Sequence, residues 1–270
     1  MKWLEPAHHK QEEEEFRNVQ DRDAHPWTPA ARATEGRTMI QIRPAGDRGR
    51  TDWGWLDSRH TFSFGDYRDP GHVSFRSLRV LNDDRVKAGA GFGTHGHSDM
   101  EILSYVLEGA LEHKDSSGGG GVIRPGEIQF MRAGSGVTHS EYNHSKTEPV
   151  HFLQIWIVPD SRNLAPAYGQ KAFDREAPKK AFVLLASNDG RSGTIQVHQD
   201  VDVWLTLLAP NERRELRMRP GRHAWVHVAR GAASLNGIDL REGDGAAVSN
   251  EEILTFLGKE SAEILLFDLG

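Results

Sequence analysis

Cysteine is missing from the 270 residues of this chain, which excludes disulfide bonds, thiolate zinc sites, iron–sulfur clusters and a cysteine nucleophile. Any metal ion must therefore be held by nitrogen and oxygen ligands, and the chain has 14 histidines and 39 acidic residues. No apolar run approaches the roughly 18 residues that a membrane-spanning helix needs, and no apolar segment typical of a secretory signal is seen. We expect a cytoplasmic protein that does not contact a membrane.

An excess of positive charge is also missing, because the chain has 33 Lys and Arg residues and 39 Asp and Glu residues, which gives a formal net charge of −6. Proteins that bind nucleic acid non-specifically carry a broad basic surface, so we expect no direct nucleic-acid partner. Helical periodicity is weak along the chain, whereas 28 glycines and 12 prolines favour many tight turns. Short apolar or alternating runs between these turns predict an all-β protein.

The chain divides by composition into three parts. Residues 1–38 contain a run of four glutamates and few apolar residues, so we predict a disordered N-terminal extension that cannot build a core. Residues 39–165 and 180–270 follow the pattern of short strands and turns, and a polar, proline-bearing connection separates them. We predict one β-barrel from each of these two parts.

A degenerate internal repeat indicates that the two barrels are related. The segment 107–111 (LEGAL) resembles 229–233 (ARGAA), and the segment 124–127 (RPGE) resembles 241–244 (REGD). Predicted strands lie on both sides of the connection, at 74–81, 101–107, 151–158, 201–208, 224–228 and 264–267.

Two short motifs, each of which follows a glycine-rich stretch, carry residues that are able to bind a metal ion. One residue separates His95 from His97, and one residue separates His139 from Glu141. The side-chain period of an extended strand is two, so the members of each pair share a face. Two such strands facing into one barrel bring three nitrogens and one oxygen together. Such a set leaves open positions on an octahedral ion such as Fe(II), Mn(II), Co(II) or Ni(II).

Glu101 leaves the identity of the carboxylate ligand open at this stage. It follows His97 by four residues, and it either replaces Glu141 as a ligand or orients a histidine from outside the ligand set. Four other histidines are expected at the surface or in structural hydrogen bonds, namely His60, His113, His144 and His198.

These motifs resemble the two motifs of the cupins and, more narrowly, those of the pirin family, whose members include pirin-like bacterial quercetin 2,3-dioxygenases. The resemblance rests mainly on residues 91–109 and 133–141. Supporting stretches lie at 54–64, 80–84, 154–157, 197–200 and 265–269. It covers residues 39–270 and implies two cupin (jelly-roll) β-barrels in one chain.

The resemblance also implies a ligand set. The family binds its metal through two histidines of the first motif, the histidine of the second motif and the glutamate two residues later, which match His95, His97, His139 and Glu141. On this basis Glu141 is the carboxylate ligand and Glu101 lies outside the ligand set. Gly96 stands where the family usually has proline, and glycine leaves the histidine pair less pre-organised, so we expect weaker metal binding.

A function follows from the same resemblance. It implies one divalent metal ion, Fe(II) first, with Mn, Co, Ni, Cu or Zn as alternatives. The activity it implies is that of a dioxygenase that cleaves a flavonol such as quercetin with O2. Glu141 would then be the catalytic base as well as a ligand. The alternatives are a redox-responsive, non-enzymatic regulator that acts through a protein partner, and a cupin hydrolase or isomerase.

The remaining features receive structural interpretations. No second metal site is expected in the C-terminal barrel, because Arg217 and Arg219 fall where the first repeat has its paired histidines. Two barrels in one chain can bury each other, which favours a monomer. Among the aromatic residues, Phe64 and Phe92 are expected to line a substrate pocket and Trp53, Trp55 and Trp156 to fill the β core.

Overall fold

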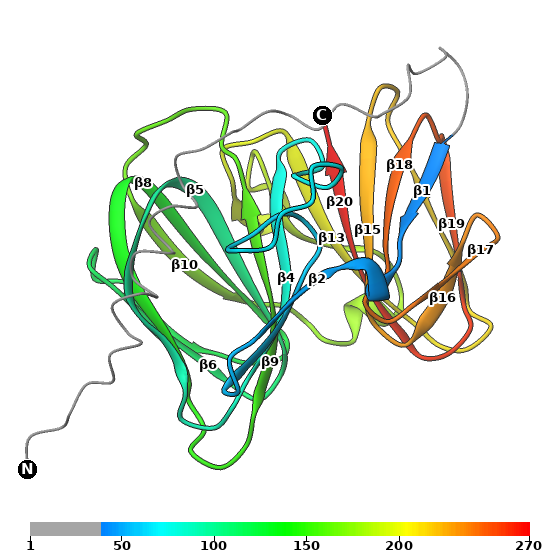
Figure 1. Ribbon diagram of the computed structural model, residues 1–270. Helices are drawn as coiled ribbons and strands as arrows, with labels where there is room; N and C mark the ends of the chain where they lie inside the picture. The colour runs from blue at the N-terminus through cyan, green and yellow to red at the C-terminus, as the bar shows by residue number, and fades with distance from the viewer. Residues whose placement is uncertain (1–38) are drawn as a thin grey trace, which may run out of the picture. The chain divides into compact units, whose positions relative to one another are not determined.

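The computed structural model describes residues 39–270, and the predicted extension over 1–38 lies outside the described residues. Within that part of the chain, regular structure consists of twenty β-strands and three short 3-10 helices (Figure 1). The prediction of an all-β protein is therefore confirmed. No helix in the described residues is long and apolar enough to cross a membrane.

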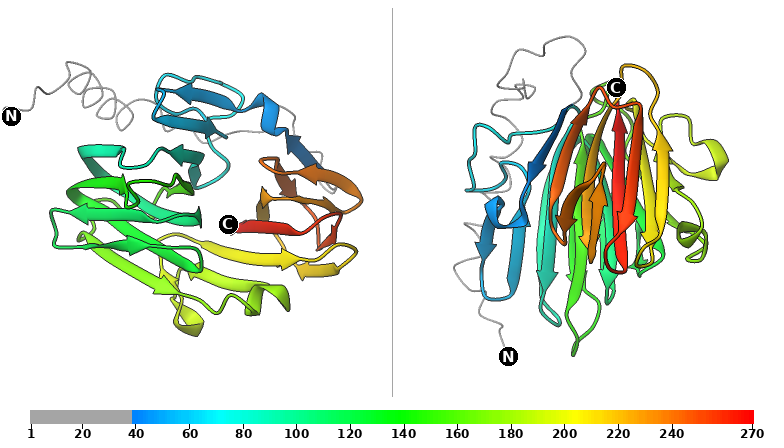
Figure 2. Two further views of the ribbon diagram at one scale, coloured as in Figure 1. Left: turned by 90° about the horizontal axis from the view of Figure 1, so that it is seen from below. Right: turned by 90° about the vertical axis from the view of Figure 1, so that its right-hand side faces the viewer.

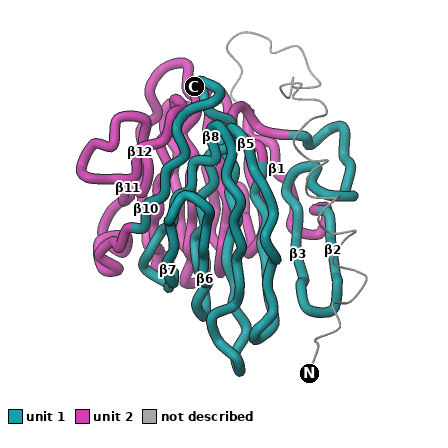
Figure 3. The backbone as a smooth tube through the Cα atoms, turned by 90° about the vertical axis from the view of Figure 1, so that its left-hand side faces the viewer, with its two compact units in different colours: residues 1–25, 49–73, 80–170 teal, residues 26–48, 74–79, 171–270 magenta. Residues whose placement is uncertain are grey.

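The described residues form two compact units, each assembled from separate stretches of the chain (Figure 3). Unit 1 contains residues 49–73 and 80–170, and unit 2 contains residues 39–48, 74–79 and 171–270. The units therefore interleave along the sequence, whereas composition suggested two consecutive segments. One cause is β1 (Met39–Arg43), which pairs antiparallel with β18 (Gly245–Ser249) in unit 2.

Unit 1 is organised around a nine-stranded sheet, whose main path runs β2-β3-β4-β9-β5-β8-β6-β7, with β10 paired to β8. Its strands are β2 (Gly49–Asp52), β3 (Leu56–His60), β4 (Leu78–Val86), β5 (Gly91–Glu108), β6 (Leu111–Asp115), β7 (Gly120–Ile123), β8 (Glu127–Asn143), β9 (Val150–Ile157) and β10 (Ala167–Ala172). Apolar side chains of these strands form buried clusters, among them one around Val106 and Phe152 and one around Ile102 and Met131.

The strand predictions for unit 1 hold where the apolar run is long. Every residue of β9 is buried, as a continuous apolar run predicts for a central strand. The strand predicted over 74–81 is wrong in its first half, because β4 begins only at Leu78. Arg76 has a φ of +55°, and this left-handed conformation interrupts an extended chain. The predicted connection also contains β10 and the 3-10 helix η2 (Ala177–Lys179).

Unit 2 contains two sheets, ordered β1-β18-β15-β20-β13-β11-β12 and β14-β19-β16-β17. The elements not yet given are η1 (Ala45–Asp47), β11 (Val183–Ser187), η3 (Arg191–Gly193), β12 (Ile195–Gln196), β13 (Val201–Leu208), β14 (Arg213–Arg217), β15 (His223–Arg230), β16 (Ala232–Leu235), β17 (Ile238–Arg241), β19 (Ile253–Gly258) and β20 (Ala262–Leu269). In Figure 2, β15, β20 and β13 lie side by side. Apolar side chains from both sheets, such as Val226 and Phe256, form one core cluster.

The internal repeat has a structural counterpart. Gly109 between β5 and β6 and Gly231 between β15 and β16 both have φ values near +70°, at +74° and +71°. A Cβ atom on Gly109 would lie 2.6 Å from the carbonyl oxygen of Pro149, and one on Gly231 would clash with the carbonyl oxygen of Ser261. Only glycine combines this backbone conformation with so close an approach. The same turn therefore recurs in both units.

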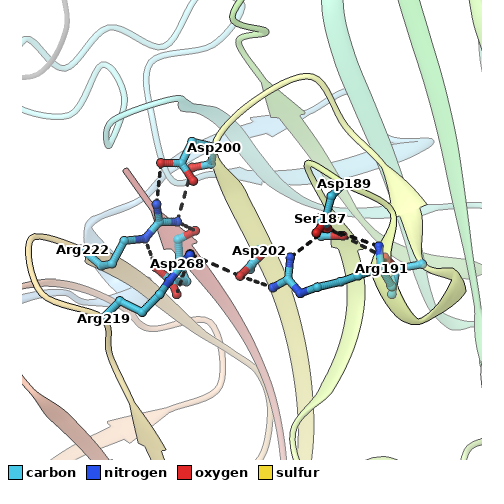
Figure 4. A network of polar contacts seen from close by, with 9 residues as sticks. Ser187, Asp189, Arg191, Asp200, Asp202, Arg219, Arg222 and Asp268 are labelled. Carbon is cyan, nitrogen blue, oxygen red and sulfur yellow. Dashed lines mark hydrogen bonds and ion pairs between the residues drawn. The ribbon is translucent and has the colours of Figure 1, made fainter.

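Unit 2 also carries a network of ion pairs that contains two buried carboxylates (Figure 4). Asp202 of β13 lies directly opposite Asp268 of β20, and both are buried. Burial raises the pKa of Asp268, and the hydrogen bond from Arg222 Nε at 2.6 Å offsets part of this rise. Arg191 pairs with Asp202, and Arg219 lies within 4.0 Å of both carboxylates. Arginines thus compensate two like charges that face each other on neighbouring strands.

Candidate metal centre

The four residues predicted as metal ligands lie on β5 and β8, which pair antiparallel in unit 1. His95 lies directly opposite His139, and His97 follows two residues further along β5. The pairing shifts register between Phe92 and His95 and again between His97 and Asp99. Such bulges bend a strand and re-aim its side chains. Two neighbouring strands therefore present the histidines as the period-two spacing predicted.

The three imidazoles converge on one point. His139 Nε2 lies 2.9 Å from His97 Nε2 and 3.0 Å from His95 Nε2. His97 and His139 are buried, and His95 is half-buried. Convergence of several ring nitrogens is the geometry in which proteins bind transition metals. The described residues thus contain a group of three histidines that could hold an ion.

The protonation state of these imidazole rings is compatible with binding of a metal cation. His95 Nδ1 lies 2.8 Å from the carbonyl oxygen of Gly93, so Nδ1 carries the proton and Nε2 has a lone pair. Burial lowers the pKa of His95. Burial, followed by the neighbouring imidazoles, lowers the pKa values of His97 and His139 well below the usual range. The rings are therefore neutral at pH 7, which is the form that binds metal.

Glu141 follows His139 by two residues, and its side chain is buried. Its Oε2 accepts a hydrogen bond from Gln154 Nε2 at 2.8 Å, and Ser104 Oγ lies 3.2 Å from Oε1. The carboxylate forms a second metal-capable group with His139 and His113, whose ligand atoms all lie within 4.8 Å of one another. A buried carboxylate is thus held beside the imidazole cluster, where it can accept a proton or bind a metal ion.

Glu101, the other carboxylate candidate, is fully buried and lies in β5 opposite Arg132 of β8. It belongs to neither of the two metal-capable groups in the described residues. The structure therefore places the carboxylate of Glu141, and not that of Glu101, in a group with His139. This geometry favours Glu141 as the fourth ligand, an assignment that stays a prediction.

An open cavity adjoins the imidazole cluster. Its empty space is about 760 Å³, including the part open to solvent, and His95, His97 and Glu141 contribute to its lining. The other lining side chains include Thr51, Trp53, Ser58, His60, Phe64, Asp66, Asn82, Asp84, Phe92, Gln154 and Trp156. Pockets for small molecules combine apolar walls with a few polar groups in this way. The cavity therefore suits a small aromatic molecule that reaches the cluster.

The aromatic residues around the cavity confirm some expectations and correct others. Phe64 and Phe92 line it, as predicted. Trp156 is buried but also contributes to the lining, and its ring centroid lies 4.9 Å from that of His97. The prediction that Trp53 fills the core is wrong, because Trp53 is 39% exposed and lines the cavity. Trp55 packs against the cluster that contains Leu56.

Two histidines outside the motifs are hydrogen-bonded within the fold, as expected, but the sequence did not predict that they lie beside the site. His60 is buried and hydrogen-bonded, yet it lines the cavity. His113 is also buried, and its Nδ1 lies 3.3 Å from Nδ1 of the predicted ligand His139. A signal for His113 was present, because His113 and Asp115 have the same spacing as the histidines of the first motif.

Comparison with known proteins gives matches along nearly all of the described chain. The Pirin family model matches residues 41–157, and the model described as Quercetinase C-terminal cupin domain matches residues 184–269. A protein of Escherichia coli (strain K12) named quercetin 2,3-dioxygenase is 45% identical over 231 residues, covering 86% of this chain and 99% of that protein. A protein of Pseudomonas aeruginosa named putative quercetin 2,3-dioxygenase is 40% identical over 233 residues, covering 86% and 100%.

Solved structures give the same result. The crystal structure of YhhW from Escherichia coli matches with a TM-score of 0.83 and 44% identity, over 86% of this chain and 98% of that chain. The structure of bacterial pirin YhhW from the same organism in complex with nickel(II) matches with a TM-score of 0.81 and 44% identity, over 86% and 99%. These matches confirm the predicted resemblance in sequence and in fold.

Proposed function

The chain belongs to the pirin family, and from this premise we propose that it is a metal-dependent dioxygenase that cleaves a flavonol such as quercetin with O2. The observation that carries this function is the convergence of three imidazoles beside a buried carboxylate, at a cavity with aromatic walls. Relatives matched over almost their whole length are named quercetin 2,3-dioxygenase. These names favour an enzyme over a regulatory protein.

The residues that would hold one divalent metal ion are His95, His97, His139 and Glu141. The three histidines form one metal-capable group, and Glu141 shares a second such group with His139 and His113. Nitrogen and oxygen ligands of this kind accept Fe(II), Mn(II), Co(II) and Ni(II), and availability decides between these ions. We propose Fe(II) as the resident ion, and metal analysis of protein purified without added metal tests this choice. When bound, the ion would act as a Lewis acid that lowers the pKa of the flavonol 3-hydroxyl group.

Glu141 would act as the general base. Its carboxylate lines the cavity, so it can reach the hydroxyl proton of a bound flavonol. Gln154 donates a hydrogen bond to Oε2 and Ser104 lies beside Oε1, so the carboxylate is held in place before substrate binds. Loss of the proton converts the flavonol to an electron-rich enolate, which reacts with O2, and cleavage of the ring releases carbon monoxide.

The aromatic walls would hold the planar substrate and exclude water. Trp156 contacts His97 edge to face, and Phe64 contacts Trp156 in the same way, with ring centroids 5.5 Å apart. Phe92 lies next to Glu141 across the β5–β8 pairing. A flat aromatic molecule between such rings gains stacking contacts, and exclusion of water protects a reactive enolate from side reactions.

The decisive experiment compares quercetin loss with and without O2 in protein loaded with Fe(II), Mn(II), Co(II) or Ni(II). We expect O2-dependent loss with one carbon monoxide released per quercetin. Glu141→Gln should lower kcat about 10²- to 10⁴-fold, as expected for loss of a general base, and His139→Ala should abolish turnover. His144→Ala is the matched control, because His144 is an exposed histidine whose side chain pairs with the exposed Glu112.

Two results would contradict these roles. Absence of O2-dependent quercetin loss with all four metal ions would reject the dioxygenase function. Unchanged kcat in Glu141→Gln, with turnover intact, would reject Glu141 as the base while leaving the function in place.

A further inference from the structure

A chain of three side chains runs from Asp115 through His113 to His139. His139 Nδ1 lies 3.3 Å from His113 Nδ1, and His113 Nε2 lies 3.1 Å from Asp115 Oδ2. The side chains of His113 and Asp115 are fully buried. Strand pairing produces this contact, because β6 lies next to β8 (Figure 3) and Asp115 is directly opposite His139. A predicted metal ligand is therefore backed by a buried carboxylate through an intervening imidazole.

The loop after β6 determines the direction of these hydrogen bonds. Asp115 Oδ1 accepts hydrogen bonds from the backbone N–H groups of Ser117 at 2.8 Å and Gly119 at 2.9 Å, and from Ser117 Oγ at 2.6 Å. With Oδ1 occupied by three donors, Oδ2 remains as the acceptor for His113 Nε2–H. His113 Nδ1 then has a lone pair and accepts the proton of His139 Nδ1–H. His139 Nε2 is left with its lone pair directed at the imidazole cluster.

We propose that Asp115 and His113 are positioning residues, which fix the tautomer and ring orientation of His139 for metal binding. This inference rests on the proposed metal site, and it adds two residues that lie outside the predicted ligand set. Hydrogen bonds to the far nitrogen of a metal-binding histidine typically contribute a factor of about 10–100 in metal affinity. His95 needs no such side chain, because its Nδ1 donates to the backbone carbonyl of Gly93.

The surroundings keep this chain of hydrogen bonds dry and in place. The ring of Tyr168 stacks on His113, with centroids 5.1 Å apart and planes at 19°. A Cβ atom on Gly119 would clash with Asp115 Oδ2 and would lie 2.6 Å from Tyr168 Cβ. Residue 119 must therefore be small for the loop to reach the carboxylate.

Asp115→Asn tests the direction of the chain. The amide oxygen of Asn can keep the hydrogen bonds from the loop, so its NH2 group then faces His113 Nε2. His113 must switch tautomer and donate from Nδ1, and His139 must accept there and carry its proton on Nε2, where the metal binds. We expect Ni(II) affinity, measured by competition with a chromophoric chelator, to fall about 10- to 100-fold. The spectrum of the Co(II)-loaded variant should change as well.

A second substitution should reverse this defect. In His113→Asn, the amide oxygen takes the place of Nδ1 and accepts the proton of His139 Nδ1–H whatever residue 115 is. The double variant His113→Asn/Asp115→Asn should therefore bind Ni(II) more tightly than Asp115→Asn alone. A role in packing alone predicts the opposite, since two substitutions in a buried cluster add their costs. The matched control is Glu112→Gln, the same chemical change in the exposed partner of His144, which should leave the affinity unchanged.

The possible outcomes distinguish a positioning role of His113 and Asp115 from a role in packing alone and from direct metal binding by His113. Ni(II) affinity of folded Asp115→Asn within twofold of the wild type, or a double variant no tighter than Asp115→Asn, would overturn the positioning role. If Asp115→Asn fails to fold, His113→Asn should bind Ni(II) more tightly than His113→Leu, and equal affinities would overturn it. A loss in His113→Asn as complete as in His97→Ala would make His113 a ligand and also overturn it. Because the readout is Ni(II) binding, wild-type protein that binds Ni(II) without turning over quercetin would reject the dioxygenase function alone.

Discussion

Acid should destabilise the metal-free protein through the three histidines of the imidazole cluster. Burial lowers the pKa values of His95, His97 and His139 in the folded protein, whereas an exposed histidine in the unfolded chain has a pKa of about 6.5. Below that value the unfolded chain binds more protons than the folded protein does. The free energy of unfolding therefore rises with pH in this range and falls as acid is added.

The size of the effect follows from the number of protons. Each proton bound only by the unfolded chain changes the free energy of unfolding by about 1.4 kcal/mol per pH unit. The pKa values of His97 and His139 are lowered well below the usual range, so these two histidines alone give a slope of about 2.5 kcal/mol per pH unit near pH 5.5. His95, whose pKa is also lowered, adds to this slope, which vanishes above about pH 7.5, where neither state is protonated. A whole domain is stable by only about 5–15 kcal/mol, so one pH unit removes a large part of that stability.

Urea unfolding of EDTA-treated protein at a series of pH values between about 5.5 and 8 measures this slope. His97→Gln removes one of the three protons, so its slope should be smaller than that of the wild type by about 1.4 kcal/mol per pH unit. A change in the absolute free energy of unfolding does not affect this comparison, because the slope depends only on the difference in bound protons between the unfolded and folded states. Equal slopes for the wild type and His97→Gln would refute the assignment of these histidines as neutral.

Three further predictions concern the same unit. Excess Ni(II) should raise the free energy of unfolding by about 4 kcal/mol at 1,000 times its Kd, and thermal unfolding of His139→Ala should show no such gain. Burial, followed by the nearby carboxylates, raises the pKa of Tyr168 to about 12. The ultraviolet titration of the wild type minus that of Tyr168→Phe should therefore show no transition below about pH 11, given a usual value near 10. Gly96→Ala should stabilise the metal-free protein by about 0.4–1 kcal/mol by restricting the unfolded chain, because a Cβ atom there meets nothing closer than 3.9 Å. A loss of stability in urea unfolding would contradict that prediction.

The histidines of the site could be predicted because their arrangement follows from local geometry. A strand directs alternate side chains to one face, so the pairs His95/His97 and His139/Glu141 needed only extended chain to share a face. Which strand lies beside which is a long-range property, and here the family resemblance supplied it. The register that places His95 opposite His139 depends on a register shift between Phe92 and His95 in the β5–β8 pairing, which composition and periodicity do not show.

Several of the parts that the sequence did not predict depend on long-range pairing. β1 pairs with β18 about 200 residues away, and the pattern of Met39–Arg43 is that of any half-buried strand. Trp53 is a large aromatic residue of the kind that fills a core. It directly follows β2, however, which is the edge strand of the sheet of unit 1, and it is exposed at the cavity. His113 and Asp115 had the spacing of a shared face, but only the β6–β8 register shows that this face meets His139.

The predicted ligands His95 and His139 differ in how their orientation is fixed, and this difference determines which substitutions can alter metal binding. The acceptor for His95 is a backbone carbonyl at Gly93, which a side-chain substitution does not remove. The acceptor for His139 is a side chain, supported by a carboxylate whose second oxygen is tied to the loop. Substitutions at 113 and 115 can therefore change metal affinity while every ligand is kept, because they change the donor and acceptor pattern behind His139 and not the ligand atoms themselves.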